Sequence, residues 1–384
     1  MLLSKGFEVE IYTGKLTGEI VGLSDRIIRD LDGFVREPDS RNVEYTTAPF
    51  CRYERLLCAL LAPRRLLRNY LHQLGEYTLI PGSTLSLGGS DRFCRSDPNN
   101  PYHNFIEKSY GTTVVTASVH INLGIQDSEM LMRACRLVRA EACLYLALSA
   151  ASPFLDGKAT GYHSTRWHLF PETPSRVPLF HSHQHYIDWT HEQLSAGTMQ
   201  NVRHLWIAVR PNGDRRPYCL NRLELRICDL IADPLVLLAV TALLEARLWQ
   251  LFAHPDALDP LSQSSLTPEE LLDLIAKNES AAAHKSLDAT LYHWQDGRPL
   301  TARKWLENLY ETVFPFANAR GFASALAPLL KVLQTGNVAQ QWLRQNRLGL
   351  TPSQILTTAI TQLARQENEL SEKLCRQAES LLAV

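Results

Sequence analysis

The chain has 384 residues, and at roughly 150 residues per domain this length allows one large domain or two modest ones. Its 39 Lys and Arg residues balance 40 Asp and Glu residues, while 45% of residues are hydrophobic and 21% charged, which is ordinary for a soluble globular protein. The near-neutral charge provides no field that would attract a polyanion, so the composition argues against a nucleic-acid partner.

The hydrophobic pattern divides the chain near Pro234. Residues before this point form short alternating segments separated by turns, whereas apolar residues after it recur at helical spacing. We therefore expect a β-rich part at about 1–232 and a helical part at about 233–384.

The first predicted strand, residues 5–12, alternates strictly between apolar and polar side chains. In a strand, Phe7 and Val9 would face one side while Glu8 and Glu10 face the other. Two carboxylates this close repel each other unless a cation lies between them, and Mg²⁺ prefers oxygen ligands of this kind. The segment is therefore either part of a metal site or a solvated strand face.

Three further segments combine the same alternation with acidic, imidazole or guanidinium groups. They span residues 43–47, 112–123 and 222–228, and a further acid, Glu37, lies seven residues before the acid of the first. Their polar faces carry Glu44, His120, Asn122, Glu224 and Arg226.

If these strands share one sheet, their polar faces line a single cavity. Several carboxylates, one histidine and convergent arginines are what metal-assisted phosphoryl chemistry needs, since carboxylates hold Mg²⁺ and arginines neutralise the transferred group. For each segment alone, surface charge is the alternative, and His120 is equally consistent with a core histidine.

Two capping motifs predict helix starts in the part of the chain after Pro234. Residues 267–270 and 351–354 each place Thr at the N-cap, Pro at the first helical position and an acid or amide three residues after the cap. The second start predicts one long amphipathic helix from Pro352 to about Leu382, or two abutting helices.

The cysteines and the apolar runs suggest a cytoplasmic protein without a membrane partner. Eight cysteines lie far apart with no CxxC pair, so we expect most to be reduced and buried, with Cys51 and Cys58 packing at helical spacing. The longest apolar run, residues 235–244, is shorter than the about 20 residues that a bilayer needs. Glu8 interrupts the N-terminus before a signal-peptide core could form.

Residues 180–192 contain four histidines: His181, His183, His185 and His191. A strand would align the first three and favour a transition-metal site, whereas a helix would scatter them. The alternative is a role in a substrate pocket or at the surface. Trp167, Trp189 and Trp206 either stack on a ligand or pack in the core.

Taken in order, these motifs resemble those of the glutamate-cysteine ligases and related carboxylate-amine ligases of the glutamine synthetase-like superfamily. The sequences VHINLG and SPFLDGKATGY are most similar to those of the cyanobacterial type of glutamate-cysteine ligase. The matching stretches are residues 6–10, 37–47, 116–124, 152–166, 206–211 and 224–229, with a looser match at 278–289.

The resemblance implies an α+β fold: a saddle-shaped, mainly antiparallel sheet with helices packed behind it, and a helical C-terminal half. It implies one catalytic domain over residues 1–384, with the active site on the concave face of the sheet. Two or three Mg²⁺ ions, or Mn²⁺, would bracket ATP within a shell formed by Glu8, Glu10, Glu37, Glu44, His120 and Glu224.

The resemblance also implies roles for the basic residues. Arg226 would contact the transferring phosphoryl group, with Glu224 and Arg166 beside it in catalysis. Arg166 and Arg210 would hold substrate carboxylate or phosphate, and Asn122 would bind ATP or substrate. Lys158 either joins this binding set or caps a turn.

The implied reaction is ATP-dependent ligation of the L-glutamate side chain to L-cysteine through γ-glutamyl phosphate, the first step of glutathione synthesis. No covalent protein nucleophile is required. A different amine acceptor is the nearest alternative, and a catalytically inactive nucleotide-binding regulatory protein is another. A metallohydrolase is disfavoured by the absence of a clustered HxH or HExxH motif outside the histidine-rich segment. The oligomeric state is left open.

Overall fold

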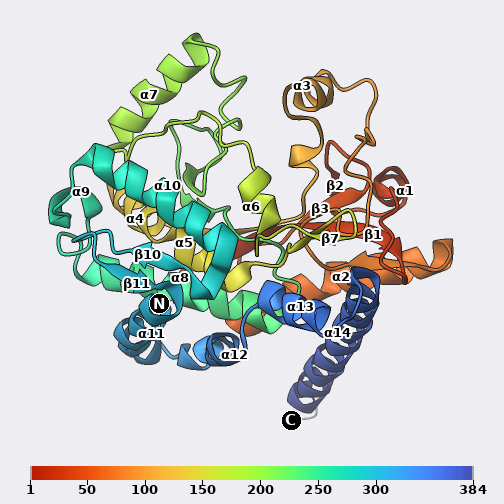
Figure 1. Cartoon of the computed structure of the whole chain (residues 1–384). Coiled ribbons are helices and arrows are strands. Elements are labelled where there is room, and N and C mark those ends of the chain that lie inside the picture. Colours follow the sequence, from red (N-terminus) through yellow and green to blue (C-terminus); the bar gives the residue numbers. More distant parts are fainter. Residues whose placement is uncertain (1, 383–384) are drawn as a thin grey trace.

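A seven-stranded antiparallel sheet forms the centre of the computed structural model, which describes residues 2–382 (Figure 1). Strand β4 pairs with β1 but lies outside the linear order of the other six strands. Two hairpins are separate from this sheet: β6 (Phe154–Leu155) with β7 (Lys158–Ala159), and β10 (Thr290–Tyr292) with β11 (Pro299–Thr301). The main strands, in spatial order, are β2 (Phe34–Arg36), β3 (Asn42–Thr46), β1 (Lys5–Lys15), β5 (Val119–Gly124), β9 (Arg222–Leu225) and β8 (Val209–Asn212), with β4 at Tyr77–Ile80.

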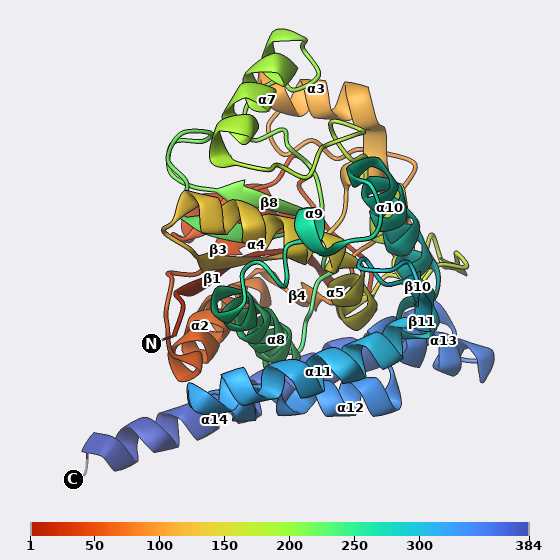
Figure 2. The same cartoon turned by 90° about the vertical axis from the view of Figure 1, so that its left-hand side faces the viewer.

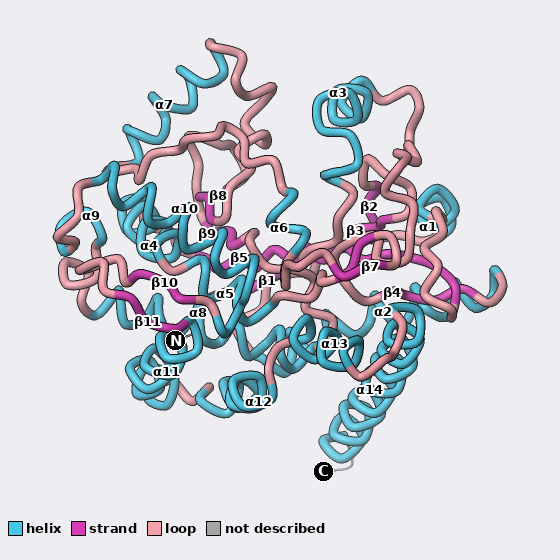
Figure 3. Tube along the Cα trace, in the orientation of Figure 1, coloured by secondary structure: helices cyan, strands magenta, loops and turns pink. Residues whose placement is uncertain are grey.

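Helices surround this sheet (Figure 3). Those that precede residue 232 are α1 (Ser24–Asp30), α2 (Tyr53–Leu74), α3 (Pro101–Tyr110), α4 (Ser128–Ala140), α5 (Ala142–Ser149), α6 (Thr165–Leu169) and α7 (His183–Ser195). Those that follow are α8 (Pro234–Ala253), α9 (Pro260–Gln263), α10 (Pro268–Lys285), α11 (Ala302–Ala319), α12 (Ala327–Thr335), α13 (Val338–Arg347) and α14 (Pro352–Leu382). Short 3₁₀ turns occur at η1 (Gly111–Val114), η2 (Ser286–Asp288) and η3 (Ala323–Leu326).

The two faces of the sheet have different neighbours. Phe7, Val9 and Ile11 of β1 are buried in one apolar core with Leu56 and Leu60 of α2. Helix α2 contacts β4 and α8, and α8 packs against α11 and α12. Figures 1 and 2 show these helices on one side of the sheet, with α3 and α7 rising on the other side. The polar strand faces therefore look toward α3 and α7.

The α+β class and the antiparallel sheet expected from the sequence are confirmed. The strands predicted at 5–12, 43–47 and 222–228 correspond to β1, β3 and β9. Both predicted helix starts are also present. Thr267 and Glu270 form a reciprocal capping box at α10, and Thr351 and Gln354 exchange the same pair of hydrogen bonds at α14, which is one continuous helix.

The prediction of a strand over 112–123 is wrong for its first part. Residues 111–114 form the turn η1 directly after α3, and the strand begins only at Val119. Residues 111–114 have no partner among the described strands, and from Val115 to Leu123 polar and apolar side chains are both buried, so the alternation does not mark a longer strand. The β-rich part also contains the helices α1 to α7.

Helix α8 is longer than the apolar run that predicted it. Pro234–Ala253 has 20 residues, so by length and composition it is the one described helix that could cross a membrane. However, 72% of its apolar window is buried inside the structure, as in a core helix. Asp233 caps its first turn by accepting hydrogen bonds from Leu235 N and Val236 N.

The expectation of mostly buried cysteines is wrong in part. Among the described side chains, Cys135, Cys143 and Cys228 are buried, whereas Cys51, Cys58 and Cys219 are exposed and Cys94 is partly exposed. The i, i+7 spacing of Cys51 and Cys58 does not lead to packing because Cys51 precedes α2 and Cys58 lies on its solvent side. Cys375 lies outside the described side chains.

Candidate active site

Strand register brings the acidic side chains to one face of the sheet. Glu8 of β1 lies opposite both Thr46 of β3 and His120 of β5, and Glu10 lies opposite Glu44. Residues that face each other in an antiparallel pair project to the same side, as do residues two apart in one strand. The polar faces predicted separately for these strands therefore form one surface.

The first cluster of possible metal ligands consists of Glu8, His120 and Glu224. One ligand atom of each lies within 4.8 Å of the others. His120 Nδ1 lies 3.0 Å from Glu8 Oε2 and 3.6 Å from Glu224 Oε1. Ser118 Oγ lies 3.2 Å from His120 Nε2 and donates to Glu10 Oε2 at 2.7 Å, which links this cluster to the next.

The second cluster consists of Glu10, Glu37 and Glu44, again with ligand atoms within 4.8 Å of one another. Glu37 follows β2 directly, so the turn after that strand carries it over β3. Burial, then repulsion from Glu10 and Glu8, raises the pKa of Glu44 to about 8. Burial, then Glu10 and Glu44, raises the pKa of Glu37 well above its usual value.

The two clusters differ in how their charge is balanced. At Glu224, burial acts to raise the pKa, but the positive charges of Arg210, Arg226 and His120 outweigh it and hold the pKa well below its usual range. At Glu8, burial and Glu224 act to raise the pKa, and the hydrogen bond and charge of His120 outweigh them, so it is also lowered. The second cluster shows no arginine within ion-pair distance among the described residues.

This arrangement fits divalent cations. Three carboxylates in the second cluster lie close together, with only His120 Nε2 near them among the described basic groups, 3.9 Å from Glu10 Oε1. Proton uptake is the response of such a group when no metal is bound. Oxygen ligands of this kind suit Mg²⁺ or Mn²⁺, and the histidine of the first cluster is compatible with Mn²⁺ as well.

The arginines expected at the site are mostly held by protein groups. Arg210 donates to Glu224 with Nε at 2.7 Å and Nη2 at 3.1 Å, and its Nη1 donates to the carbonyls of Arg203 and Leu205. Arg166 donates to the carbonyls of Ile227 and Arg226, so it positions the chain after β9.

Arg226 and Asn122 lie beside the first cluster. Arg226 Nη1 donates to Glu224 Oε1 at 2.6 Å and lies 3.3 Å from His120 Nδ1, while its buried Nε has no hydrogen-bond partner. Asn122 Nδ2 donates to Glu8 Oε1 at 3.2 Å. Lys158 lies elsewhere: it is exposed in the β6–β7 hairpin and is not among the residues that line the cavities described below.

Two cavities adjoin over these residues. One, of about 500 Å³, contains both clusters apart from buried Glu224, with Arg166, Arg210 and Arg226 in its wall. The other, of about 530 Å³, is lined by Asn122 and shares Glu8, Thr46 and Arg222 with the first. The site therefore has room for substrate on both sides of Glu8.

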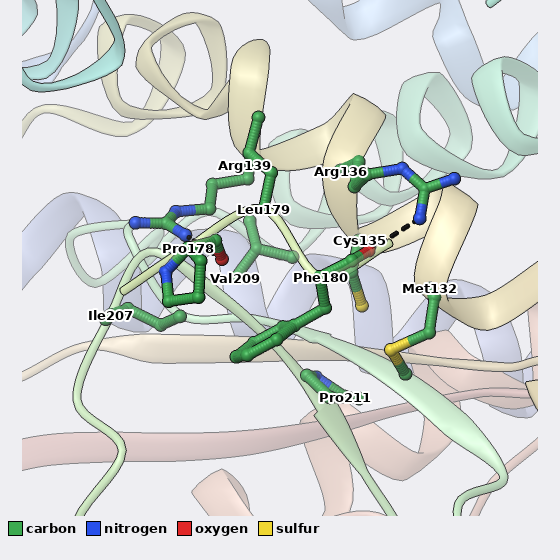
Figure 4. Close-up of a pocket in the computed structure, with 10 residues that line it drawn as sticks. All are labelled: Met132, Cys135, Arg136, Arg139, Pro178, Leu179, Phe180, Ile207, Val209 and Pro211. Carbon is green, nitrogen blue, oxygen red and sulfur yellow. Dashed lines mark hydrogen bonds between the residues drawn. The ribbon is translucent and has the colours of Figure 1, made fainter. Parts of the chain in front are cut away.

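A third hollow lies away from these carboxylates (Figure 4). It is lined by α4, residues 178–180 and residues 207–211, and Arg136 Nη1 donates to Phe180 O at 2.6 Å. Its volume is about 10 Å³, which is room for roughly one water molecule. It is therefore too small for a substrate.

Several residues that line the 500 Å³ cavity were not expected from the sequence: Arg36, Tyr102, His103, Arg203 and Arg216. Tyr102 and His103 belong to α3, whose start is marked by the cap Asn100 and by Pro101 at the first helical position, and Arg203 and Arg216 lie in loops. For Arg216 a signal existed, since it lies between the matching stretches 206–211 and 224–229. Trp206 also lines this cavity, whereas Trp167 and Trp189 are buried.

The histidine-rich segment is helical, which contradicts the strand needed to align His181, His183 and His185. Helix α7 begins at His183, and about 3.6 residues per turn direct these rings differently. His181 and His185 contact each other through their Nδ1 atoms. His183 Nε2 lies 2.8 Å from Pro217 O, and His191 Nε2 lies 2.7 Å from the Tyr218 hydroxyl. Two of the four histidines therefore contact the loop between β8 and β9.

Comparison with known proteins identifies relatives of this chain. The family model described as "Glutamate-cysteine ligase family 2(GCS2)" matches residues 4–376. A protein of Rubrobacter xylanophilus named "Putative glutamate--cysteine ligase 2-1" is 24% identical over 344 residues, which cover 86% of this chain and 85% of that protein.

Two solved structures share the fold. A bifunctional glutathione synthetase from Pasteurella multocida has a TM-score of 0.73 at 15% identity, and the match covers 95% of this chain but only 53% of that one. A glutamate-cysteine ligase from Francisella tularensis, in complex with AMP, has a TM-score of 0.70 at 11% identity, with 99% of this chain and 94% of that chain covered. The narrower likeness to the cyanobacterial type stays a prediction.

Proposed function

The chain belongs to glutamate-cysteine ligase family 2, and from this premise we propose that it joins the side-chain carboxylate of L-glutamate to the amine of L-cysteine at the expense of ATP. In the proposed reaction, the glutamate carboxylate attacks the γ-phosphorus of ATP and ADP leaves. The cysteine amine then attacks the resulting γ-glutamyl phosphate, loses a proton and displaces phosphate. The product is γ-glutamylcysteine, the substrate for a second ligation in glutathione synthesis.

The observation that carries this proposal is the presence of two three-residue clusters beside Arg226, whose members all line one cavity except buried Glu224. We assign Glu8, His120 and Glu224 to one divalent-cation site and Glu10, Glu37 and Glu44 to another. When bound there, Mg²⁺ supplies positive charge that offsets the phosphate oxygens of ATP.

The remaining residues of the site position and neutralise the reacting groups. Arg226 has a buried Nε without a protein partner, and its guanidinium faces the cavity, so it can donate to the transferring phosphoryl group. Arg210 and Arg166 act through other residues in this proposal: Arg210 fixes Glu224, and Arg166 fixes the backbone that carries Arg226.

Glu224 is at the same time a ligand and an anchor for both arginines. A preorganised cluster of this kind contributes to catalysis by stabilising charge and by positioning the reacting groups, and neither effect requires a protein nucleophile. We propose a cytoplasmic location, because ATP and reduced cysteine are both available there.

The test is ADP release by the purified protein with Mg²⁺-ATP and L-glutamate, with and without L-cysteine, followed by mass spectrometry of the product. Release that depends on both amino acids, with γ-glutamylcysteine as product, is the expected result. Glutamate-dependent release that ignores cysteine and responds to another amine would favour a ligase of different acceptor specificity. ATP binding without release in the presence of any amine would favour the regulatory alternative.

A further inference from the structure

Arg216 differs from the other arginines in the wall of the 500 Å³ cavity in being partly buried without an ion pair; Arg203, which also lacks one among the described residues, is exposed. Arg210 and Arg226 share Glu224, Arg36 lies within 4 Å of two aspartates, and Arg222 lies 3.6 Å from an aspartate oxygen. Arg216 is half-buried, yet it forms no ion pair within the part of the chain that the structure describes. Its Nη1 atom is buried without a hydrogen-bond partner.

A partly buried guanidinium without a partner lowers the stability of the protein unless a bound ligand supplies the partner. Burying a charged group without a partner loses hydration that nothing in the protein replaces. Burial, and then the nearby charge of Arg210, lower the pKa of Arg216 to about 10, which leaves the guanidinium charged at neutral pH. A bound anion would balance the charge and accept hydrogen bonds from the part of the guanidinium that lines the cavity.

The loop that carries Arg216 is held in place from two sides. Within the loop, Tyr218 N and Cys219 N both donate to Arg215 O at 2.9 Å. From outside, His183 and His191 of α7 contact Pro217 O and the Tyr218 hydroxyl. Arg216 is therefore presented to the cavity by a braced segment and does not depend on a free loop for its position.

The position of Arg216 separates it from the phosphate-binding groups of the proposed reaction. It lies in the connection between β8 and β9, at the far end of the sheet order from β2 and β3, which carry or precede Glu37 and Glu44. Arg226 and the first cluster, which β1, β5 and β9 carry, lie between them in the sheet order. An anionic group at Arg216 is therefore on the opposite side of Glu224 from the second cluster.

Guanidinium groups bind carboxylates with two parallel hydrogen bonds, and a planar fork of this kind suits an amino acid's carboxylate well. We propose that Arg216 binds the α-carboxylate of an amino-acid substrate at the β8–β9 end of the cavity. The inference rests on the proposed function and adds the residue that recognises the non-reacting end of a substrate.

Glutamate and the amine acceptor both carry an α-carboxylate, so the experiment must separate them. Arg216→Met removes the charge and keeps much of the side-chain length, and Arg216→Lys retains the charge without the fork. Arg215→Met is the matched control, because Arg215 precedes Arg216 in the same loop but is exposed and contacts Cys219 Sγ at 3.3 Å. Circular dichroism establishes that each variant is folded.

We expect Arg216→Met to raise the KM of one amino-acid substrate by about 10- to 100-fold, the range for loss of a hydrogen bond to a charged group. The KM of ATP and the kcat at saturating substrate should stay near the wild-type values. Arg216→Lys should recover part of the loss, and Arg215→Met should behave as the wild type. A rise in the KM of glutamate or of cysteine supports the inference and identifies which carboxylate is bound.

Decarboxylated analogues provide the second measurement. Wild type should use 4-aminobutanoate less well than glutamate, or cysteamine less well than cysteine, whereas Arg216→Met should use the analogue of the bound substrate as well as wild type does. Unchanged KM values for both amino acids, or a rise confined to the KM of ATP, would overturn the inference while the proposed function stands. Wild-type protein that releases no ADP with any amino acid would instead refute the proposed function, and this inference with it.

Discussion

Replacement of Glu224 by Gln should destabilise the fold as well as stop turnover, whereas replacement of Glu8 by Gln should stop turnover alone. Both residues belong to the first cluster, but their surroundings differ. The Glu224 side chain is 0% exposed and accepts from Arg210 Nε at 2.7 Å, Asn212 Nδ2 at 2.7 Å and Arg226 Nη1 at 2.6 Å. The Glu8 side chain is 25% exposed and is repelled by Glu224.

The magnitude follows from these contacts. Glu224→Gln leaves two buried guanidinium groups without their carboxylate, and removal of one partner from a buried pair costs about 3–5 kcal/mol. That is a large part of the 5–15 kcal/mol by which a typical native protein is stable. Glu8→Gln loses contacts with His120 and Asn122 but relieves the repulsion from Glu224, so its cost should stay below about 1.5 kcal/mol.

The assay is urea unfolding monitored by circular dichroism, in the presence of EDTA so that metal binding makes no contribution, combined with ADP release by the same samples. Asp214→Asn, which alters an exposed neighbour of Arg222, is the control for loss of an acid near the site. The reasoning would be refuted if the free energy of unfolding of Glu224→Gln lay within about 1 kcal/mol of the wild-type value, or if Glu8→Gln lowered it equally.

Three further predictions use other groups. The pKa of Glu44 is raised to about 8, so its contribution to stability is fully present below its ordinary pKa near 4.5 and is lost as the pH rises through about 8. Urea midpoints in EDTA should therefore fall more between pH 5 and 8.5 for wild type than for Glu44→Gln, and equal slopes would contradict the assignment. Mg²⁺ should raise the melting temperature more at pH 8.5 than at pH 6, because the metal competes with these protons; a shift that does not depend on pH, measured by calorimetry, would argue against the second cluster. Glu367→Gln should lower the free energy of unfolding by about 3–5 kcal/mol, because buried Glu367 of α14 pairs with Arg64 and Arg68 of α2. A loss below about 1 kcal/mol in urea unfolding would show that these ion pairs do not hold α14 in place.

Much of the local structure was predictable from short patterns. Alternation located β1, β3 and β9, and the Thr-Pro motifs located the starts of α10 and α14. Alternation failed at residues 111–114, where the chain leaves α3 in a partly exposed 3₁₀ turn, because a turn and a strand can show the same spacing. The histidine-rich segment was undecided for the same reason, and only the structure identifies it as α7.

The sequence predicted which residues form the candidate site better than it predicted how they are arranged. The acids Glu8, Glu10, Glu37 and Glu44 and the residue His120 were all named from the sequence, and the structure brings them together. The partners of the arginines were not predictable, because Arg166 reaches carbonyls 60 and 61 positions away and Arg210 meets Glu224 only through the register in which β8 pairs with β9. Arg216 went unnoticed although it lies between two recognised motifs.

The sequence by itself determined which side chains share a face of each strand and where the capped helices begin. Both properties follow from covalent geometry and from hydrogen bonds within a few residues. Only the tertiary structure decided that Glu8 lies opposite His120, that Glu224 anchors two arginines, and that Arg216 keeps a free guanidinium nitrogen. These depend on strand register and on burial. Glu8 and His120 are 112 positions apart, and Arg210, only 14 positions from Glu224, meets it because β8 pairs with β9 in one register.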